Sequence, residues 1–89
     1  MKKDFSHLAL KEDFITAVAL DCITDMSEED KGTMLKNPNA SLYHFGYGIY
    51  IRNTYLYPFT YKFRFYIFMM ERLSASIIEK IIALLQQTT

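Results

Sequence analysis

Apolar residues recur every three or four positions in three stretches of the chain, which is the spacing of one face of an α-helix. In residues 10–26 the apolar rows lie apart from most of the charges, and Glu12 and Asp13 suit the positive end of a helix dipole. Residues 71–87 have a wider stripe, which predicts a central helix packed on two sides or the contact seam of an oligomer. That stripe consists of Leu73, Ile77, Ile78, Ile81, Ile82, Leu84 and Leu85.

A shorter helix is predicted to begin at Ser27. Ser27 and Asp30 have the spacing of a capping box, in which two side chains bond the first free N–H groups of a helix. The sequence Asn37-Pro38-Asn39 then predicts the end of this helix and a turn of the chain.

The third periodic stretch, residues 42–57, predicts a helix that starts near Gly46. Gly46 and Gly48 each lower helix propensity by about 1 kcal/mol, but they let another backbone approach closely. One side of this helix would hold Phe45, Ile49, Arg52, Asn53 and Leu56. Another side would hold Tyr43, Tyr47, Tyr50, Thr54 and Tyr57.

Residues 59–68 are ambiguous, because Lys62 and Arg64 alternate with aromatic residues at the period of a β-strand. A single strand is unstable alone, so this segment either pairs with a second copy or is helical. The other elements predict one all-α domain over residues 1–89. It is a compact small bundle of about four helices, in which the C-terminal helix packs against the first.

Length and composition agree with a single packed domain. The chain has 89 residues, and its 51% hydrophobic content argues against disorder. Such a short chain buries only about 60–65% of its unfolded surface, so a partner or self-association would stabilise it. The zero net charge hides an acidic half, residues 1–41, and a basic half, residues 42–89. We interpret the acidic half as a solvated face.

The sequence predicts a soluble, cytoplasmic protein with no membrane segment. Met1-Lys2-Lys3 is followed by Asp4 rather than by the apolar stretch of a signal peptide, and charges interrupt both long apolar runs. Cys22 is the single cysteine, so an intramolecular disulfide is impossible and a reducing compartment fits. We expect Cys22 to be a small core residue rather than a nucleophile.

Twelve of the fourteen aromatic residues lie between Tyr43 and Phe68, a window without acidic residues. Tyrosine fills cores poorly because a buried hydroxyl needs a hydrogen-bond partner, whereas it supplies contact area at low entropic cost. Seven tyrosines in this window are more than a core of this size easily satisfies. We therefore predict a partner-binding surface made of Tyr43, Tyr47, Tyr50, Tyr57, Lys62 and Arg64.

Arg52 and Asn53 are the polar pair that the sequence singles out for a specific role, either as a structural clamp or as an anion site. A buried guanidinium needs acceptors for its five donors. The favoured interpretation is a structural clamp, in which Arg52 bonds Asp21, Asp25 or a helix C-terminus. The alternative is that the pair binds a phosphate or carboxylate of a ligand.

Catalytic and metal-binding patterns are weak. His44 has no His, Cys or acidic residue within four positions, so we expect it to cap or pack rather than to bind a metal or catalyse. The Gly46-x-Gly48 spacing is too short for a dinucleotide fingerprint, and no Walker motif is present. We expect no enzyme activity, no cofactor and no metal.

Residues 43–53 carry a pattern more specific than composition. Their sequence, HFGYGIYIRN after Tyr43, resembles the His-Phe-Gly-x-Gly-x-x-Ile-Arg-Asn signature of a family of small, uncharacterised bacterial and phage domains. The layout is similar over most of residues 14–86, but family members tend to carry tryptophan where this chain has Tyr50 and Tyr55. Their acidic pair before the last helix is reduced to Glu71. The resemblance implies an all-α fold, favours helix or irregular structure at residues 59–68, and brings no known activity.

Two functions follow from these observations. The first is a protein-interaction module, which the resemblance extends to an inhibitor, antitoxin or immunity-type protein that occupies a partner surface. The alternative is binding of a nucleotide or of single-stranded nucleic acid, with aromatic residues stacking on bases and Arg52, Lys62 and Arg64 neutralising phosphates. Three positive charges are few for that purpose, so we favour a protein partner. A homo-oligomer is compatible with either function.

Overall fold

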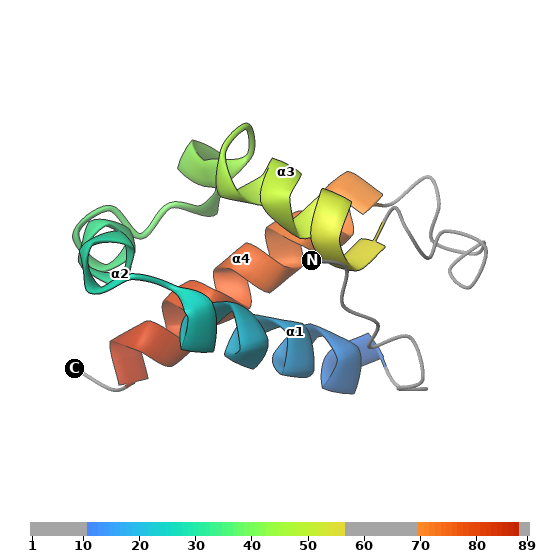
Figure 1. The fold of residues 1–89 in the computed structure, drawn as a ribbon, viewed down its shortest axis with the longest axis horizontal. Coiled ribbons are helices and arrows are strands. Elements are labelled where there is room, and N and C mark those ends of the chain that lie inside the picture. Colours follow the sequence, from blue (N-terminus) through green and yellow to red (C-terminus); the bar gives the residue numbers. More distant parts are fainter. Residues whose placement is uncertain (1–10, 57–69, 88–89) are drawn as a thin grey trace.

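The computed structural model describes residues 11–56 and 70–87. These residues form an all-α bundle, as predicted, and the described ranges contain no strand (Figure 1). The candidate strand at residues 59–68 lies outside the described residues. The elements are α1 (Lys11–Asp25), α2 (Glu28–Lys36), the 3-10 helix η1 (Ala40–Tyr43), α3 (Tyr47–Ile51), the π-helical turn η2 (Arg52–Leu56) and α4 (Met70–Gln87).

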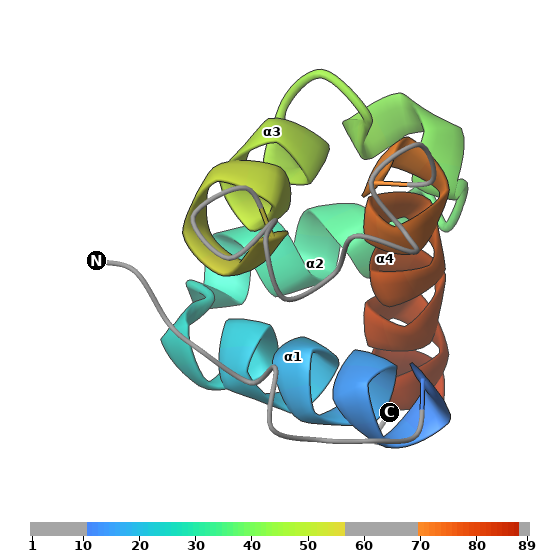
Figure 2. The same cartoon turned by 90° about the vertical axis from the view of Figure 1, so that its right-hand side faces the viewer.

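Helix α4 is the centre of the bundle. It packs most extensively against α1, as predicted, and it also contacts α2, η1, α3 and η2. Figure 2 shows α4 upright, with α1 crossing its lower part and α3 beside its upper part. The wide apolar stripe of α4 is therefore covered within the monomer, which is the first of the two predicted arrangements. Its buried residues are Leu73, Ser74, Ile77, Ile78, Ile81, Ile82 and Leu85.

Local capping sets the ends of α2. The Ser27 side chain accepts a hydrogen bond from the Asp30 backbone N–H at 3.1 Å, which is one of the two bonds of the predicted capping box. The Asn37 N–H bonds the Thr33 carbonyl as α2 ends. The Asn39 side chain then accepts the Ser41 N–H at 3.1 Å and starts η1. The turn predicted at residues 37–39 thus leads directly into a second helical element.

Of the residues predicted to share one side of the third helix, Arg52 and Leu56 are buried, whereas Phe45, Ile49 and Asn53 are exposed. Phe45 is 82% exposed and Ile49 is 42% exposed. Phe45 precedes the helix, which has Gly46 as its N-cap and begins at Tyr47. From Arg52 the backbone continues as a π-helix, whose i→i+5 bonds turn the following residues relative to an α-helical register. The buried residues of α3 and η2 are Gly48, Ile51, Arg52, Thr54, Tyr55 and Leu56.

Tyr55 links η2 to α1. Its side chain is fully buried, and its hydroxyl donates a 2.6 Å hydrogen bond to Asp21 Oδ2. Cys22, also fully buried, interacts with the hydroxyls of both Tyr55 and Tyr47. Cys22 is a core residue, as predicted, and it belongs to a polar cluster between α1 and the α3–η2 segment.

This cluster predicts a loss of stability at high pH. Burial, then the bond to Asp21, raises the pKa of Tyr55 well above its usual value near 10. The folded state therefore holds the phenol proton more tightly, so the contribution of Tyr55 to stability is constant below pH 10 and falls as the pH rises further. The expected slope is about 1.4 kcal/mol per pH unit for one proton.

Urea unfolding at pH 9 and pH 11 measures this slope. Tyr55→Phe should be less stable than the wild type at pH 9, because the bond to Asp21 is lost, yet should lose less stability between the two pH values. Equal losses in the two proteins would show that Tyr55 does not carry the effect. Tyr47 contributes in the same direction, since burial raises its pKa also.

Across the described ranges, no helix is long and apolar enough to cross a membrane.

Candidate protein-binding face

Arg52 is held inside the bundle by two acceptors. It is 6% exposed; its Nη1 donates to Ser74 Oγ of α4 at 3.0 Å, and its Nη2 donates to the His44 carbonyl at 3.1 Å. His44 is the C-cap of η1, so one acceptor is a helix C-terminus, among those predicted. Asp21 and Asp25, the other predicted acceptors, do not bond Arg52. The guanidinium thus joins η1, η2 and α4 through neutral oxygen atoms.

The absence of a side chain at Gly48 leaves room for the Arg52 guanidinium. We call this guanidinium and its two acceptors the Arg52 clamp. A Cβ atom at position 48 would lie 3.2 Å from Arg52 Nη1 and 3.3 Å from the Tyr43 carbonyl oxygen. Both contacts are tighter than ordinary van der Waals separations. The close backbone approach predicted for the glycine pair is therefore found at Gly48, whereas a Cβ at Gly46 would meet nothing within 4 Å.

Gly48, Arg52 and His44, three positions in the pattern of residues 43–53, thus have structural roles in the bundle. Asn53, the other half of the predicted polar pair, is exposed. The bundle satisfies its internal polar groups, since no buried side-chain nitrogen or oxygen in the described residues lacks a hydrogen-bond partner. Arg52 is therefore directed into the fold, where both of its terminal nitrogen atoms are bonded.

The predicted tyrosine surface divides into inner and outer members. The Tyr43 hydroxyl donates to the carbonyls of Asn37 at 2.7 Å and Thr33 at 3.2 Å, and the half-buried Tyr47 interacts with Cys22. Tyr50 is 39% exposed. The monomer thus satisfies more tyrosine hydroxyls than the composition suggested. Tyr57, Lys62 and Arg64 lie outside the described residues, so their place in the surface stays a prediction.

Four exposed, large apolar side chains fall within residues 42–50, where η1 is followed by α3. Phe45 stands near the centre of this stretch in sequence, and the Phe45 ring meets the His44 ring edge-on at 4.8 Å. Tyr47 and Tyr50 approach each other at 5.2 Å on α3. We call this set of residues the η1–α3 face; its members are Leu42 (61% exposed), Phe45 (82%), Ile49 (42%) and Tyr50 (39%).

Sequence reasoning missed three of these four residues. Helical periodicity placed Phe45 and Ile49 on the same side as Arg52 and Leu56, and Leu42 was not predicted to belong to a binding surface. A usable signal was present at Gly46, because a helix that starts there leaves Phe45 in front of its first turn. Among the described residues the other exposed large hydrophobic side chain is Leu20 on α1, at 51%.

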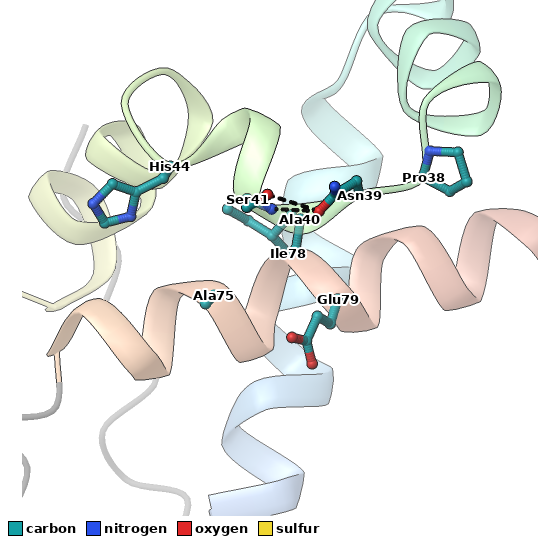
Figure 3. Close-up of a pocket in the computed structure, with 8 residues that line it drawn as sticks. All are labelled: Pro38, Asn39, Ala40, Ser41, His44, Ala75, Ile78 and Glu79. Atoms are coloured by element: carbon teal, nitrogen blue, oxygen red, sulfur yellow. Dashed lines mark hydrogen bonds between the residues drawn. The ribbon is translucent and has the colours of Figure 1, made fainter.

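A groove borders this face between η1 and α4. It holds about 590 Å³, and Figure 3 shows Pro38 and His44 near its opposite ends, with Ala75 of α4 between them in the view. Glu79 is the carboxylate among the lining residues. Because the His44 ring also contacts Phe45, the groove and the η1–α3 face share an edge. The lining residues are Pro38, Asn39, Ala40, Ser41, His44, Ala75, Ile78 and Glu79.

The described residues contain no group of three or more His, Cys, Asp or Glu side chains that could hold a metal ion. His44 contributes its backbone carbonyl to Arg52 and its ring to Phe45, in line with a packing role. What the geometry offers is apolar and aromatic contact area on a rigid support. Such a surface is suited to binding another macromolecule.

Comparison of the chain with protein-family models, with curated proteins and with solved structures finds no match. The resemblance of residues 43–53 to the small bacterial and phage domains therefore stays a prediction.

Proposed function

We propose that this chain is a small, non-catalytic module that binds another protein through the η1–α3 face. The observation that carries the proposal is the exposure of Phe45, 82% of whose surface is open to solvent. Exposed apolar area costs about 25 cal/mol per Å² relative to buried area, and protein interfaces recover that cost. Single exposed apolar residues are common, whereas four within nine positions of the sequence favour an interaction surface in this segment.

The support beneath the face strengthens the proposal. The Arg52 clamp fixes η1 against α4, and Gly48 packs against Tyr43 and Ile78. A face held in one conformation loses little entropy when a partner binds. The resemblance of residues 43–53 adds the narrower proposal that the partner is a protein to be inhibited or neutralised, as by an antitoxin or immunity protein.

Binding of a nucleotide or single-stranded nucleic acid is the second candidate. The aromatic side chains of the η1–α3 face could stack on bases. The Arg52 guanidinium, however, is buried and bonded to Ser74 and His44, which argues against its contacting a phosphate on the surface. A phosphate binder weakens steeply with added salt, whereas an apolar interface does not.

Affinity capture tests the proposal with a matched pair of variants. Phe45→Ala and Leu20→Ala each remove one large, exposed apolar side chain, from the η1–α3 face and from α1 respectively. Wild type and Leu20→Ala should retain the same protein from a host lysate. Phe45→Ala should lose it by at least about tenfold, as expected for a central aromatic contact.

Equal retention by both variants would contradict the proposed face. Release of the retained material by moderate salt, together with co-purifying nucleic acid, would favour the second candidate.

A further inference from the structure

A smaller pocket lies between α2 and the η1–α3 segment. It holds about 180 Å³ and is lined by Asp30, Thr33, Met34, Tyr43 and Tyr47. Two aromatic rings and one carboxylate thus line a space comparable with a single long side chain. We call it the α2–α3 pocket.

The two rings are fixed by their hydroxyl groups. The Tyr43 hydroxyl donates to the carbonyls of Thr33 and Asn37, and the Tyr47 hydroxyl interacts with the buried thiol of Cys22. The Tyr43 hydroxyl is therefore held within the bundle, and both tyrosines line the pocket. Met34, 3% exposed, contributes a buried thioether side chain. A pocket with walls fixed in advance binds without ordering them again.

The charge at the pocket is negative. Asp30 is exposed; its backbone N–H bonds Ser27, while its carboxylate has no ion pair among the described residues. Glu28 and Glu29 add two further acids in the same turn, and Lys31 lies 3.2 Å from Glu28. None of the described residues that line the pocket is basic. Aromatic rings and a carboxylate together attract a cation, and more strongly where water is excluded.

We propose that the α2–α3 pocket accepts a cationic side chain, the ammonium of a lysine or the guanidinium of an arginine, from the protein that occupies the η1–α3 face. Tyr47 lines the pocket and lies 5.2 Å from Tyr50 of that face, so one partner can reach both. The source of the cation rests on the proposed function; the pocket's preference for a cation does not.

The test uses the isolated full chain and small probes in place of a partner. n-Butylammonium and n-propylguanidinium are titrated at constant ionic strength while the ¹H–¹⁵N and methyl NMR signals are followed. n-Butanol, of similar size and no charge, is the matched probe. The two cations should give saturable shifts at Thr33, Met34, Tyr43 and Tyr47, with dissociation constants on the order of 10 mM, and n-butanol should not.

Two variants distinguish cation binding in the pocket from attraction by any nearby negative charge. Asp30→Asn and Glu29→Gln each remove one negative charge from the first turn of α2, but only Asp30 lines the pocket. Asp30→Asn should weaken the binding of n-butylammonium by at least about fivefold, and Glu29→Gln by less than about twofold. Circular dichroism checks that both variants keep the helical fold.

Equal shifts with n-butanol, equal effects of the two variants, or no saturable shift with either cation would each overturn the proposal. Cation binding in a chain that captures no protein would uphold the pocket and contradict the proposed function. The two failures are therefore distinguishable.

Discussion

Arg52→Leu is expected to destabilise the fold by about 2–4 kcal/mol, which is a large part of the stability of a small domain. Arg52 is 6% exposed, and its replacement removes one hydrogen-bond donor from Ser74 Oγ and one from the His44 carbonyl. A buried polar group that loses its hydrogen bond costs about 1–3 kcal/mol. Leucine fills part of the space but donates to neither oxygen atom. Urea unfolding followed by circular dichroism measures the change.

The control for this prediction is His44→Ala. The bond to Arg52 is accepted by the backbone carbonyl of residue 44, so removing the imidazole should keep it and change stability by less than about 1 kcal/mol. In a double-mutant cycle, Arg52→Leu and Ser74→Ala should cost less together than the sum of their separate effects. A stability change below about 1 kcal/mol for Arg52→Leu would show that the clamp does not hold the bundle together.

Gly48→Ala is expected to destabilise by about 1–3 kcal/mol, against the usual gain from replacing a helical glycine with alanine. The added Cβ would meet the Tyr43 carbonyl oxygen at 3.3 Å and Arg52 Nη1 at 3.2 Å. The carbonyl belongs to the backbone, so relief requires η1 and α3 to separate, which strains the clamp. Unfolding in urea measures the change in free energy.

Gly32→Ala makes the same chemical change where there is space. A Cβ at position 32 would meet nothing within 4 Å, and the residue lies inside α2. This variant should be more stable than the wild type by up to about 1 kcal/mol. Opposite signs for the two alanine variants are the expected result. A gain in stability for both would mean that the close approach at Gly48 is not required.

The sequence predicted the main helices because their signals are local or strongly periodic. Ser27 capped α2 as its spacing with Asp30 predicted, and the apolar stripe of α4 gave both its helix and its central place. Because that stripe is long, it can be recognised even when the ends of the helix are misplaced by one or two residues. The all-α bundle followed from these elements.

The candidate site was harder to predict because it depends on where periodicity breaks. The helix start at Tyr47 and the π-helical turn that begins at Arg52 decide which side chains of this segment share a face. Phe45 was therefore placed on the same side as Arg52 and Leu56, although it is the most exposed large hydrophobic side chain described. Of the two acceptors of Arg52, the sequence predicted a helix C-terminus but not Ser74, since a hydroxyl 22 positions away leaves no charge pattern in the sequence.

The number of tyrosines could not show, for a related reason, which hydroxyl groups the bundle satisfies. Tyr43 and Tyr55 find their acceptors in Asn37, Thr33 and Asp21, contacts that arise only once the helices pack. Composition gives the number of hydroxyl groups but not the carbonyl and carboxylate oxygen atoms that tertiary structure brings near them. Within residues 43–56, the described part of the aromatic window, Tyr43 and Tyr55 are therefore less available to a partner than their number suggested.

Site-specific photo-crosslinking tests most directly whether the η1–α3 face binds a protein. p-Benzoylphenylalanine replaces Phe45 in one variant and Leu20 in another, both at exposed apolar positions. After irradiation in the host, the position-45 variant should form one discrete adduct with a protein, and the position-20 variant should not. No protein adduct at position 45, or the same adduct at both positions, would contradict the account.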